Sequence, residues 1–372
     1  MDARTRIGPA LLLAVAILPS GCQAPHLLEL AGGQLAILRA RQPVARLQAD
    51  PATPAALRDR LALAGELLDF AHAELGLPDN GSYRQYVDLG RDYPVWNVFA
   101  APEFSLELRS WCFPVAGCTA YRGYFDEGAA QAYAQRLAGQ GLDVFVGPAV
   151  AYSTLGFFRD PLLSNVVALP EAGLAGLLFH ELAHQQLYVA GDTAFSESFA
   201  TVVEREGVLR WLRARGDGEG LCRFRDGLER REAVWALITA ARQQLAAVYA
   251  STAGDAERRA AKAAVFAQLR HDYDALRATW PGPPWFDGWL AGPLNNARLG
   301  ALAAYDQHVA ALQLVLAAED GDLPAFYRRA ERLGRLRAAD RAGILAYLGA
   351  GPVPAPDAPC RAASADLQQQ VP

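Results

Sequence analysis

Apolar residues recur at helical spacing through most of the chain after Pro170. Residues three and four positions apart share one helix face, so residues 171–348 are predicted to be almost entirely helical. Short alternating or apolar runs typical of strands occupy residues 95–99, 105–109, 119–124, 143–146 and 150–155. Helical spacing before Pro170 covers residues 27–48, 55–75 and 126–138. The pattern predicts an α+β protein in which a small mixed β-sheet is followed by a mostly helical half.

One run inside the helical half has the pattern H-E-x-x-H: His180-Glu181-Leu182-Ala183-His184. Residues four apart stack on one helix face, so His180 and His184 can direct two imidazoles at one point. Two neutral imidazoles suit one Zn²⁺ ion. Glu181 would lie beside the ion, where its carboxylate can take a proton from water and return it to a leaving amine. The motif predicts a zinc peptidase; the alternative is a helix with two solvated or core histidines.

A zinc site needs a third protein ligand, and the next predicted helix offers Glu197. Residues 191–193 are predicted to form the turn, with a cap at residue 192 or 193, so that the second helix folds back towards the His pair. Thr201 and Glu204 share the face of Glu197, and their side chains are predicted to support the ligands. The alternative for Glu197 is an acid favoured by the helix dipole, a role that is compatible with metal binding.

The N-terminus has the features of a bacterial export signal. Two arginines within residues 1–6 precede an apolar run over residues 7–18, which is too short to span a bilayer of about 30 Å. Ser20-Gly21 then precedes Cys22, so residues 1–21 are predicted to be a signal peptide and Cys22 the acylated N-terminus. We expect a lipid-anchored protein on the periplasmic side of the bacterial cell envelope, more specifically at the outer membrane because Gln23 follows Cys22. The alternative is a plain secretory signal.

The remaining four cysteines form an even set in an oxidising compartment. Cys112 and Cys118 bracket a segment with Pro and Gly that can form a turn, so a disulfide between them is predicted. Cys222 and Cys360 are the leftover pair. A second metal site at Cys112 and Cys118 is the alternative, but their six-residue step fits no usual zinc motif.

Residues 151–207 resemble the putative aminopeptidase family of bacterial envelope lipoproteins and, more distantly, the gluzincins. The resemblance extends over residues 51–76, 80–126 and 294–299, with Tyr305. It implies a zinc metallopeptidase with one ion held by His180, His184 and Glu197, and with Glu181 as the general base. Gluzincins usually hold the third glutamate in N-E-x-x-[AS], whereas this chain has Ser196 before Glu197, and their separation between motif and glutamate is usually longer.

The order of elements is similar to that of a zincin, in which an edge strand above the zinc cleft pairs with the substrate. The segment Tyr152–Gly156 is predicted to be this strand, the alternative being a buried structural strand. Peptide hydrolysis also needs a donor for the oxyanion. Tyr305 is the first candidate and Tyr152 the second, each with an alternative role in the core.

Length and charge bound the remaining choices. The chain has 372 residues and a net charge of −5, and no basic stripe stands out, so nucleic acid is not expected as a partner. The predicted division is a signal peptide (1–21), N-terminal helices with the α/β part (22–170), the active-site helix pair with the helical half (171–350) and a loose tail rich in Pro and Ala (351–372). The predicted function is peptide hydrolysis by a zinc-dependent aminopeptidase. The alternatives are a zinc endopeptidase, or a non-catalytic lipoprotein with a structural zinc site that binds partner proteins.

Overall fold

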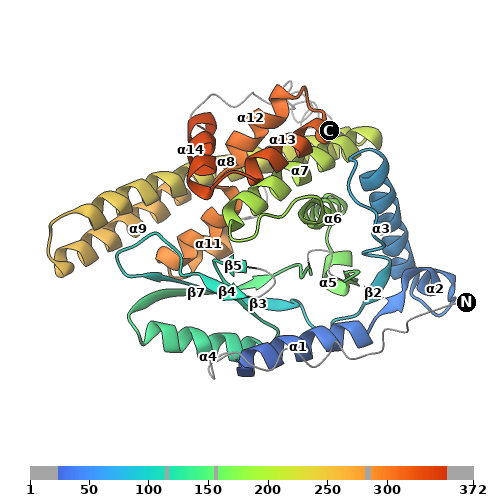
Figure 1. The fold of residues 1–372 in the computed structure, drawn as a ribbon, viewed down its shortest axis with the longest axis horizontal. Helices are drawn as coiled ribbons and strands as arrows, with labels where there is room; N and C mark the ends of the chain where they lie inside the picture. Colours follow the sequence, from blue (N-terminus) through green and yellow to red (C-terminus); the bar gives the residue numbers. More distant parts are fainter. Residues whose placement is uncertain (1–23, 114–116, 155–157, 281–285, 350–372) are drawn as a thin grey trace, which may run out of the picture.

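The computed structural model describes residues 24–113, 117–154, 158–280 and 286–349 (Figure 1). The predicted signal peptide, the lipidation site Cys22, and the tail with Cys360 lie outside these ranges, so those expectations stay predictions. Within the described ranges, we find no helix with both the length and the apolar content needed to cross a bilayer.

The described elements form a mixed α+β fold, as the sequence pattern predicts. The strands are β1 (Gln42–Pro43), β2 (Gln85–Val87), β3 (Val95–Pro102), β4 (Trp111–Phe113), β5 (Gly117–Thr119), β6 (Arg122–Tyr124), β7 (Leu142–Ala149) and β8 (Leu162–Leu163). The helices are α1 (Ala24–Arg39), α2 (Val44–Ala49), α3 (Ala55–Ala73), α4 (Glu127–Ala138), α5 (Ser164–Val167), α6 (Glu171–Gln186), α7 (Thr193–Ala214), α8 (Gly218–Ala250), α9 (Asp255–Arg277), α10 (Asp287–Ala291), α11 (Asn296–Asp306), α12 (Val309–Ala318), α13 (Leu323–Gly334) and α14 (Ala338–Gly349).

The longest strands form an antiparallel sheet in the order β6-β3-β7, covered by a helix on each face. Successive side chains of a strand point to opposite faces. Accordingly, Val98 and Ala100 of β3 pack in one apolar cluster with α4, and Phe99 and Ala101 pack in another with α11. Figure 1 shows the sheet between these two helices.

Two smaller sheets flank this one. Strands β1, β2 and β8 form a sheet in which β2 and β8 run parallel, and β4 and β5 form a hairpin. The hairpin carries the predicted disulfide between Cys112 and Cys118, which the structure confirms. A Cβ atom on Gly117 of this hairpin would lie 3.3 Å from the backbone nitrogen of Gly191, so the hairpin packs directly on the turn between α6 and α7.

Helices α6 and α7 pack against each other at the centre of the largest apolar core. Helix α3 packs on α6, whereas α11, α12 and α13 pack on α7 (Figure 1). The two central helices approach closely because Gly207 of α7 has no side chain: a Cβ there would lie 2.7 Å from the Phe179 ring of α6. The long α8–α9 hairpin extends away from this core, and its apolar residues form a separate cluster with Leu290 of α10 and Leu299 of α11.

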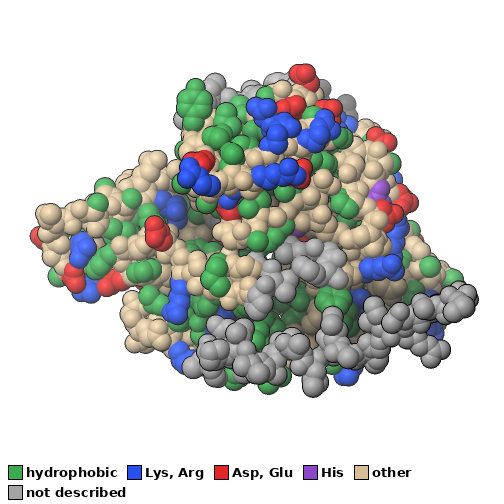
Figure 2. Space-filling model, in the orientation of Figure 1, with side chains coloured by type: hydrophobic (Ala, Val, Ile, Leu, Met, Phe, Trp, Pro, Cys, Tyr) green, Lys and Arg blue, Asp and Glu red, His purple; other side chains and the backbone are tan. Residues whose placement is uncertain are grey.

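Charged side chains of both signs share the outer surface. On the face shown in Figure 2, basic and acidic side chains lie among one another over the helices at the top of the view. This mixture agrees with the modest net charge of the whole chain.

Three expectations about elements were wrong. Residues 27–48 do not form one helix, because Gln42 and Pro43 pair with β2 as a short strand and separate α1 from α2. Residues 105–109 are not a strand. The predicted edge strand at Tyr152–Gly156 is also wrong as far as its described part, residues 152–154, shows.

The reason for the missing edge strand is a buried carboxylate. Asp160 accepts hydrogen bonds from the Ser153 hydroxyl (3.1 Å), the Thr154 backbone N–H (3.0 Å) and the Thr154 hydroxyl (2.7 Å). A strand partner would need that backbone N–H, so the local hydrogen bonds compete with strand pairing.

Candidate metal centre

Helix α6 presents both motif histidines on one side. Its apolar residues Leu174, Leu178 and Leu182 are buried in the core. His180 and His184 lie one turn apart and are themselves buried, with ring centroids 4.8 Å apart. The four-residue spacing therefore brings the two imidazoles together, as predicted.

Side-chain hydrogen bonds hold the short connection between α6 and α7, residues 187–192. The predicted cap is Asp192, whose carboxylate accepts a hydrogen bond from the N–H of Phe195 (3.0 Å). Arg341 donates to the other oxygen of Asp192 from Nε (2.9 Å) and Nη2 (2.6 Å). The hydroxyl of Ser196 accepts from the backbone N–H of Val189 (3.0 Å) and donates to the carbonyl of Asp192 (3.0 Å). Ser196 thus ties the turn to the helix that carries Glu197.

Glu197 folds back onto the histidine pair. Its Oε2 lies 3.2 Å from Nε2 of His180 and 3.5 Å from Nε2 of His184. One ligand atom from each of the three buried residues lies within 4.8 Å of the other two, so the group could hold a metal ion. Zinc bonds of 2.0–2.1 Å at a tetrahedral angle place ligand atoms about 3.3 Å apart, close to the two shorter separations.

A second carboxylate of α7 supports the group from the opposite side of the His180 ring. Oε2 of Glu204 lies 3.0 Å from Nδ1 of His180, which leaves Nε2 directed at Glu197. Gly176 makes room for this contact, because a Cβ there would lie 3.3 Å from the Glu204 side chain. Thr201 is buried on the same face of α7; among the described residues its hydroxyl has no hydrogen bond to the ligands, and its supporting role stays a prediction.

The electrostatics of the group favour a positive charge among the histidines. Burial works to raise the pKa of Glu197, but the charges and hydrogen bonds of His184 and His180 hold the pKa at about 2. Burial likewise opposes ionisation of Glu204, yet His180 and the nearby Arg231 and Arg205 lower its pKa overall. Both carboxylates therefore stay ionised and stabilise a cation or a proton at the imidazoles.

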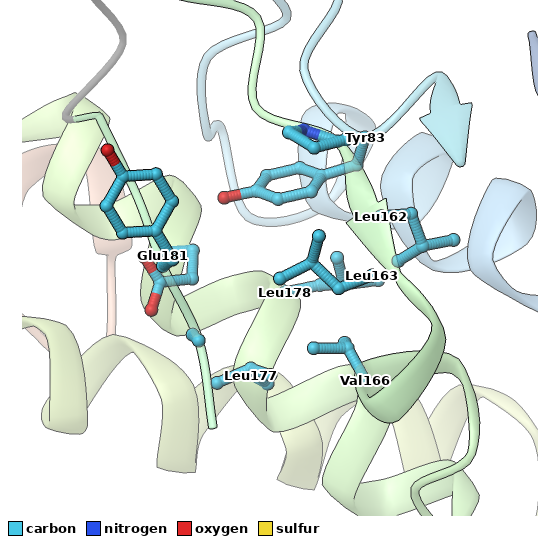
Figure 3. A pocket seen from close by; sticks show the side chains of 10 residues that line it. Tyr83, Leu162, Leu163, Val166, Leu177, Leu178 and Glu181 are labelled. Atoms are coloured by element: carbon cyan, nitrogen blue, oxygen red, sulfur yellow. The ribbon is translucent and has the colours of Figure 1, made fainter. Parts of the chain in front are cut away.

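Glu181 lies beside the group but is not part of it. It lines a small cavity of about 10 Å³, roughly the space of one water molecule, together with Tyr83 and Tyr152. Figure 3 shows the Tyr83 ring above Leu178, with its hydroxyl on the Glu181 side of the cavity. Burial raises the pKa of Glu181, while the nearby histidines lower it. A carboxyl group with a raised pKa at such a cavity can exchange a proton with a bound molecule.

Comparison with known proteins identifies the family. A family model described as "Putative aminopeptidase" matches residues 25–345, which is most of the chain. The chain belongs to this family. No curated protein and no solved structure gives a significant match. The family match covers the β-containing part as well as the helices that carry the metal centre.

The structure places the predicted tyrosines differently. Tyr152 lines the cavity beside Glu181, with its ring 5.0 Å from that of Phe125, and burial raises its pKa to about 12. Tyr305 lies near the C-terminal end of α11, as predicted for a helix after Asn295-Asn296, but its side chain is outside the described part of the structure.

Two further tyrosines near the centre were missed in the sequence. The ring of Tyr188 lies 6.1 Å from that of His184, and both burial and the charge of Glu197 raise its pKa. Burial raises the pKa of Tyr121 well above its usual range, and the charges of Glu197 and Glu181 add to the effect. Tyr188 follows the end of α6 at Gln186, so helical spacing does not place it beside His184; only its closeness in the sequence to the motif could have suggested it. No local pattern marks Tyr121, which arrives from the β5–β6 segment.

Proposed function

We propose that the chain is a zinc-dependent peptidase, an aminopeptidase in keeping with the description of its family, that hydrolyses peptides at the bacterial cell envelope. The observation that carries the proposal is the convergence of the His180, His184 and Glu197 ligand atoms, with Glu181 directly beside them. A purely structural metal site has no use for a carboxylate in the position of Glu181.

The donor set favours zinc over other common ions. Two imidazole nitrogens and one carboxylate oxygen are typical of catalytic zinc, which binds three protein ligands and keeps a fourth position for water or substrate. Calcium and magnesium prefer six or more oxygen ligands, which this buried group does not offer. The ionised carboxylates of the buried Glu197 and the partly exposed Glu204 balance the added positive charge.

The protein's own residues would then divide the chemistry. When bound, zinc would polarise the scissile carbonyl and make a water molecule more acidic. Glu181 would accept the proton of the attacking water and deliver it to the departing nitrogen. Tyrosine hydroxyls with raised pKa values remain protonated, so Tyr121, Tyr152 and Tyr188 could donate a hydrogen bond to the developing oxyanion. Tyr305, the first candidate from the sequence, stays a further candidate for this role.

The cellular location rests on the sequence. Residues 1–21 would be removed as a signal peptide, and the lipid on Cys22 would anchor the chain at the outer membrane, facing the periplasm. The Cys112–Cys118 disulfide supports an oxidising compartment.

The test uses the soluble form that lacks residues 1–22. We expect one zinc ion per chain by elemental analysis and hydrolysis of aminoacyl-nitroanilides that a chelator abolishes and added zinc restores. Glu181→Gln should keep the zinc and lose hydrolysis. Cleavage of an internally quenched peptide without cleavage of the nitroanilides would favour the endopeptidase alternative. A zinc-loaded chain that cleaves neither would favour the non-catalytic lipoprotein.

A further inference from the structure

A second, larger cavity lies next to the metal centre. It has a volume of about 430 Å³, is open to solvent, and is lined by residues of the β3–β4 loop, β5, the start of α7, α8 and α11. Thr193 and Ala194 line it, and they precede Glu197 by four and three residues on the same face of α7. With a rise of 1.5 Å per residue, the cavity begins about 5 Å along the helix from the Glu197 ligand, a distance that one or two extended substrate residues cover.

One strongly basic group faces this cavity without a partner. Arg242 of α8 lines the cavity, and its buried Nη1 atom has no hydrogen-bond acceptor. Among the described residues, no carboxylate forms an ion pair with its guanidinium. Burial lowers the pKa of Arg242, and no neighbouring acid offsets that effect. Arg242 is half-buried, and leaving one of its buried donors without an acceptor costs free energy, so a ligand carboxylate that pairs with it would be favoured.

The start of α7 adds to the positive potential. The N-terminus of a long helix carries a partial positive charge and has N–H groups without intrahelical acceptors. Asp192 occupies the N–H of Phe195, and the N–H groups of Thr193 and Ala194 have no acceptor within the described ranges. These two residues line the same cavity as Arg242.

Two carboxylates also line the cavity, and neither neutralises Arg242. Both oxygens of Asp192 are already occupied, one by the N–H of Phe195 and the other by Arg341. Glu107 is exposed to solvent on the β3–β4 loop, where its charge is screened by water. The net character of the cavity is therefore that of an anion site with an apolar wall, to which Leu106 and Leu108 contribute.

We propose that this cavity binds a carboxylate of the peptide substrate, with Arg242 as its ion-pair partner. The inference rests on the proposed function, because it gives that function a substrate class: short peptides whose free C-terminal carboxylate, or whose acidic side chain, lies within a few residues of the scissile bond. A guanidinium pairs with a planar carboxylate through two parallel hydrogen bonds, which gives specificity as well as affinity.

The experiment measures binding rather than turnover. The full-length Glu181→Gln chain, purified in detergent and loaded with zinc, is titrated by calorimetry with Ala-Ala-Ala and with its C-terminal amide. A second pair, the amides of Ala-Ala-Glu and Ala-Ala-Gln, tests the acidic side chain. In one of the two pairs, we expect the peptide with the carboxylate to bind about 10- to 100-fold more tightly than its neutral counterpart. The pair that shows the preference identifies the source of the carboxylate.

The same titrations are repeated with Arg242→Gln added. The preference should disappear, and Arg242→Lys should restore part of it. Arg223→Gln is the matched control, because Arg223 is an exposed arginine of the same helix about 28 Å closer to its N-terminus, and the preference should be unchanged. Arg242→Gln should melt at or above the temperature of the parent chain, since it removes a half-buried charge that has no ion-pair partner.

Two results would overturn the inference: equal affinity for the acids and the neutral peptides in the parent chain, or an unchanged preference after Arg242→Gln. Absence of hydrolysis by the wild-type chain would count against the proposed function alone, because the binding preference does not depend on turnover.

Discussion

Replacing Glu204 by Gln tests whether a carboxylate on α7 orients His180 for the metal ion. Oε2 of Glu204 lies 3.0 Å from Nδ1 of His180, and this contact directs the opposite ring nitrogen towards Glu197. Glutamine has nearly the same shape and can still accept one hydrogen bond, so the variant removes the charge and keeps the packing against Gly176. The change therefore isolates the electrostatic contribution of the carboxylate.

The expected magnitude follows from the position of the side chain. Acidic partners of metal-binding histidines typically change metal affinity by about 10- to 100-fold, equivalent to about 1.4–2.7 kcal/mol. The side chain of Glu204 is 34% exposed, and water screens part of its charge. We therefore expect zinc to bind about tenfold more weakly to Glu204→Gln, at the lower end of the range.

The assay is zinc titration of the purified chain in competition with a chelator of known affinity. Glu206→Gln is the matched control: Glu206 is two residues further along α7 and bonds Arg210 at 2.7 Å, on a different side of the helix. The reasoning is refuted if Glu204→Gln binds zinc within twofold of the wild type. An equal loss in Glu206→Gln would assign the effect to α7 as a whole.

Three other changes test the fold. In Gly207→Ala the new methyl group would lie 2.7 Å from a buried phenylalanine ring, so the free energy of unfolding measured in urea should fall by about 1–3 kcal/mol. In the control Gly65→Ala the methyl group would enter open space on α3, so the free energy of unfolding should rise by up to about 1 kcal/mol. Replacing Cys112 and Cys118 by Ala should cost about 2–3 kcal/mol in the same measurement, and no loss would mean that the disulfide does not restrain the unfolded chain. Burial lowers the pKa of His26 to about 4 in the folded chain. Between about pH 6.5 and 4 the histidine is therefore protonated in the unfolded chain and neutral in the folded chain, so the free energy of unfolding should fall by up to about 3 kcal/mol as the pH decreases through that window. His26→Phe should lack this pH dependence.

The metal centre was predictable because its geometry is local. The spacing of His180 and His184 determines their common helix face, and the short connection at residues 187–192, which ends in the predicted cap Asp192, returns α7 along α6. Glu197, the fifth residue of α7, then lies close enough to the start of the helix to reach the histidines. Each step depends on residues close together in the sequence, where period and capping rules are reliable.

The surroundings of the centre were not predictable, because they come from distant segments. Tyr83 and Tyr121 lie near Glu181 but belong to connections between other elements, about 100 and about 60 residues earlier in the chain, and no periodicity links them to α6. Arg242 has no neighbours in the sequence that mark it as unpaired; its isolation follows from the packing of α8 beside the cavity. Such juxtapositions require the tertiary fold.

The edge strand failed for a different reason. The alternation around Tyr152 is real, but Asp160 takes the backbone N–H of Thr154 that a strand partner would use. Sequence patterns count apolar positions and cannot show that an acid a few residues further on will compete for the backbone. The predicted substrate-pairing strand is therefore absent from residues 152–154. The disulfide-linked hairpin, which packs against Gly191, lies on the side of the metal centre that faces the larger cavity.

One face of α7 contributes to both the metal centre and the neighbouring cavity, so the position of this helix is critical. Thr193 faces the cavity, Glu197 faces the histidines, and Glu204 orients His180; the steps of four and seven residues keep all three on one side of the helix. Since Gly207 holds α7 close to α6, a methyl group there should move all three together. We therefore expect Gly207→Ala to lose stability and zinc affinity in one variant, whereas Glu204→Gln loses zinc affinity and keeps the stability of the metal-free chain. If Gly207→Ala lowered stability but bound zinc as tightly as the wild type, the position of α7 would not control the centre.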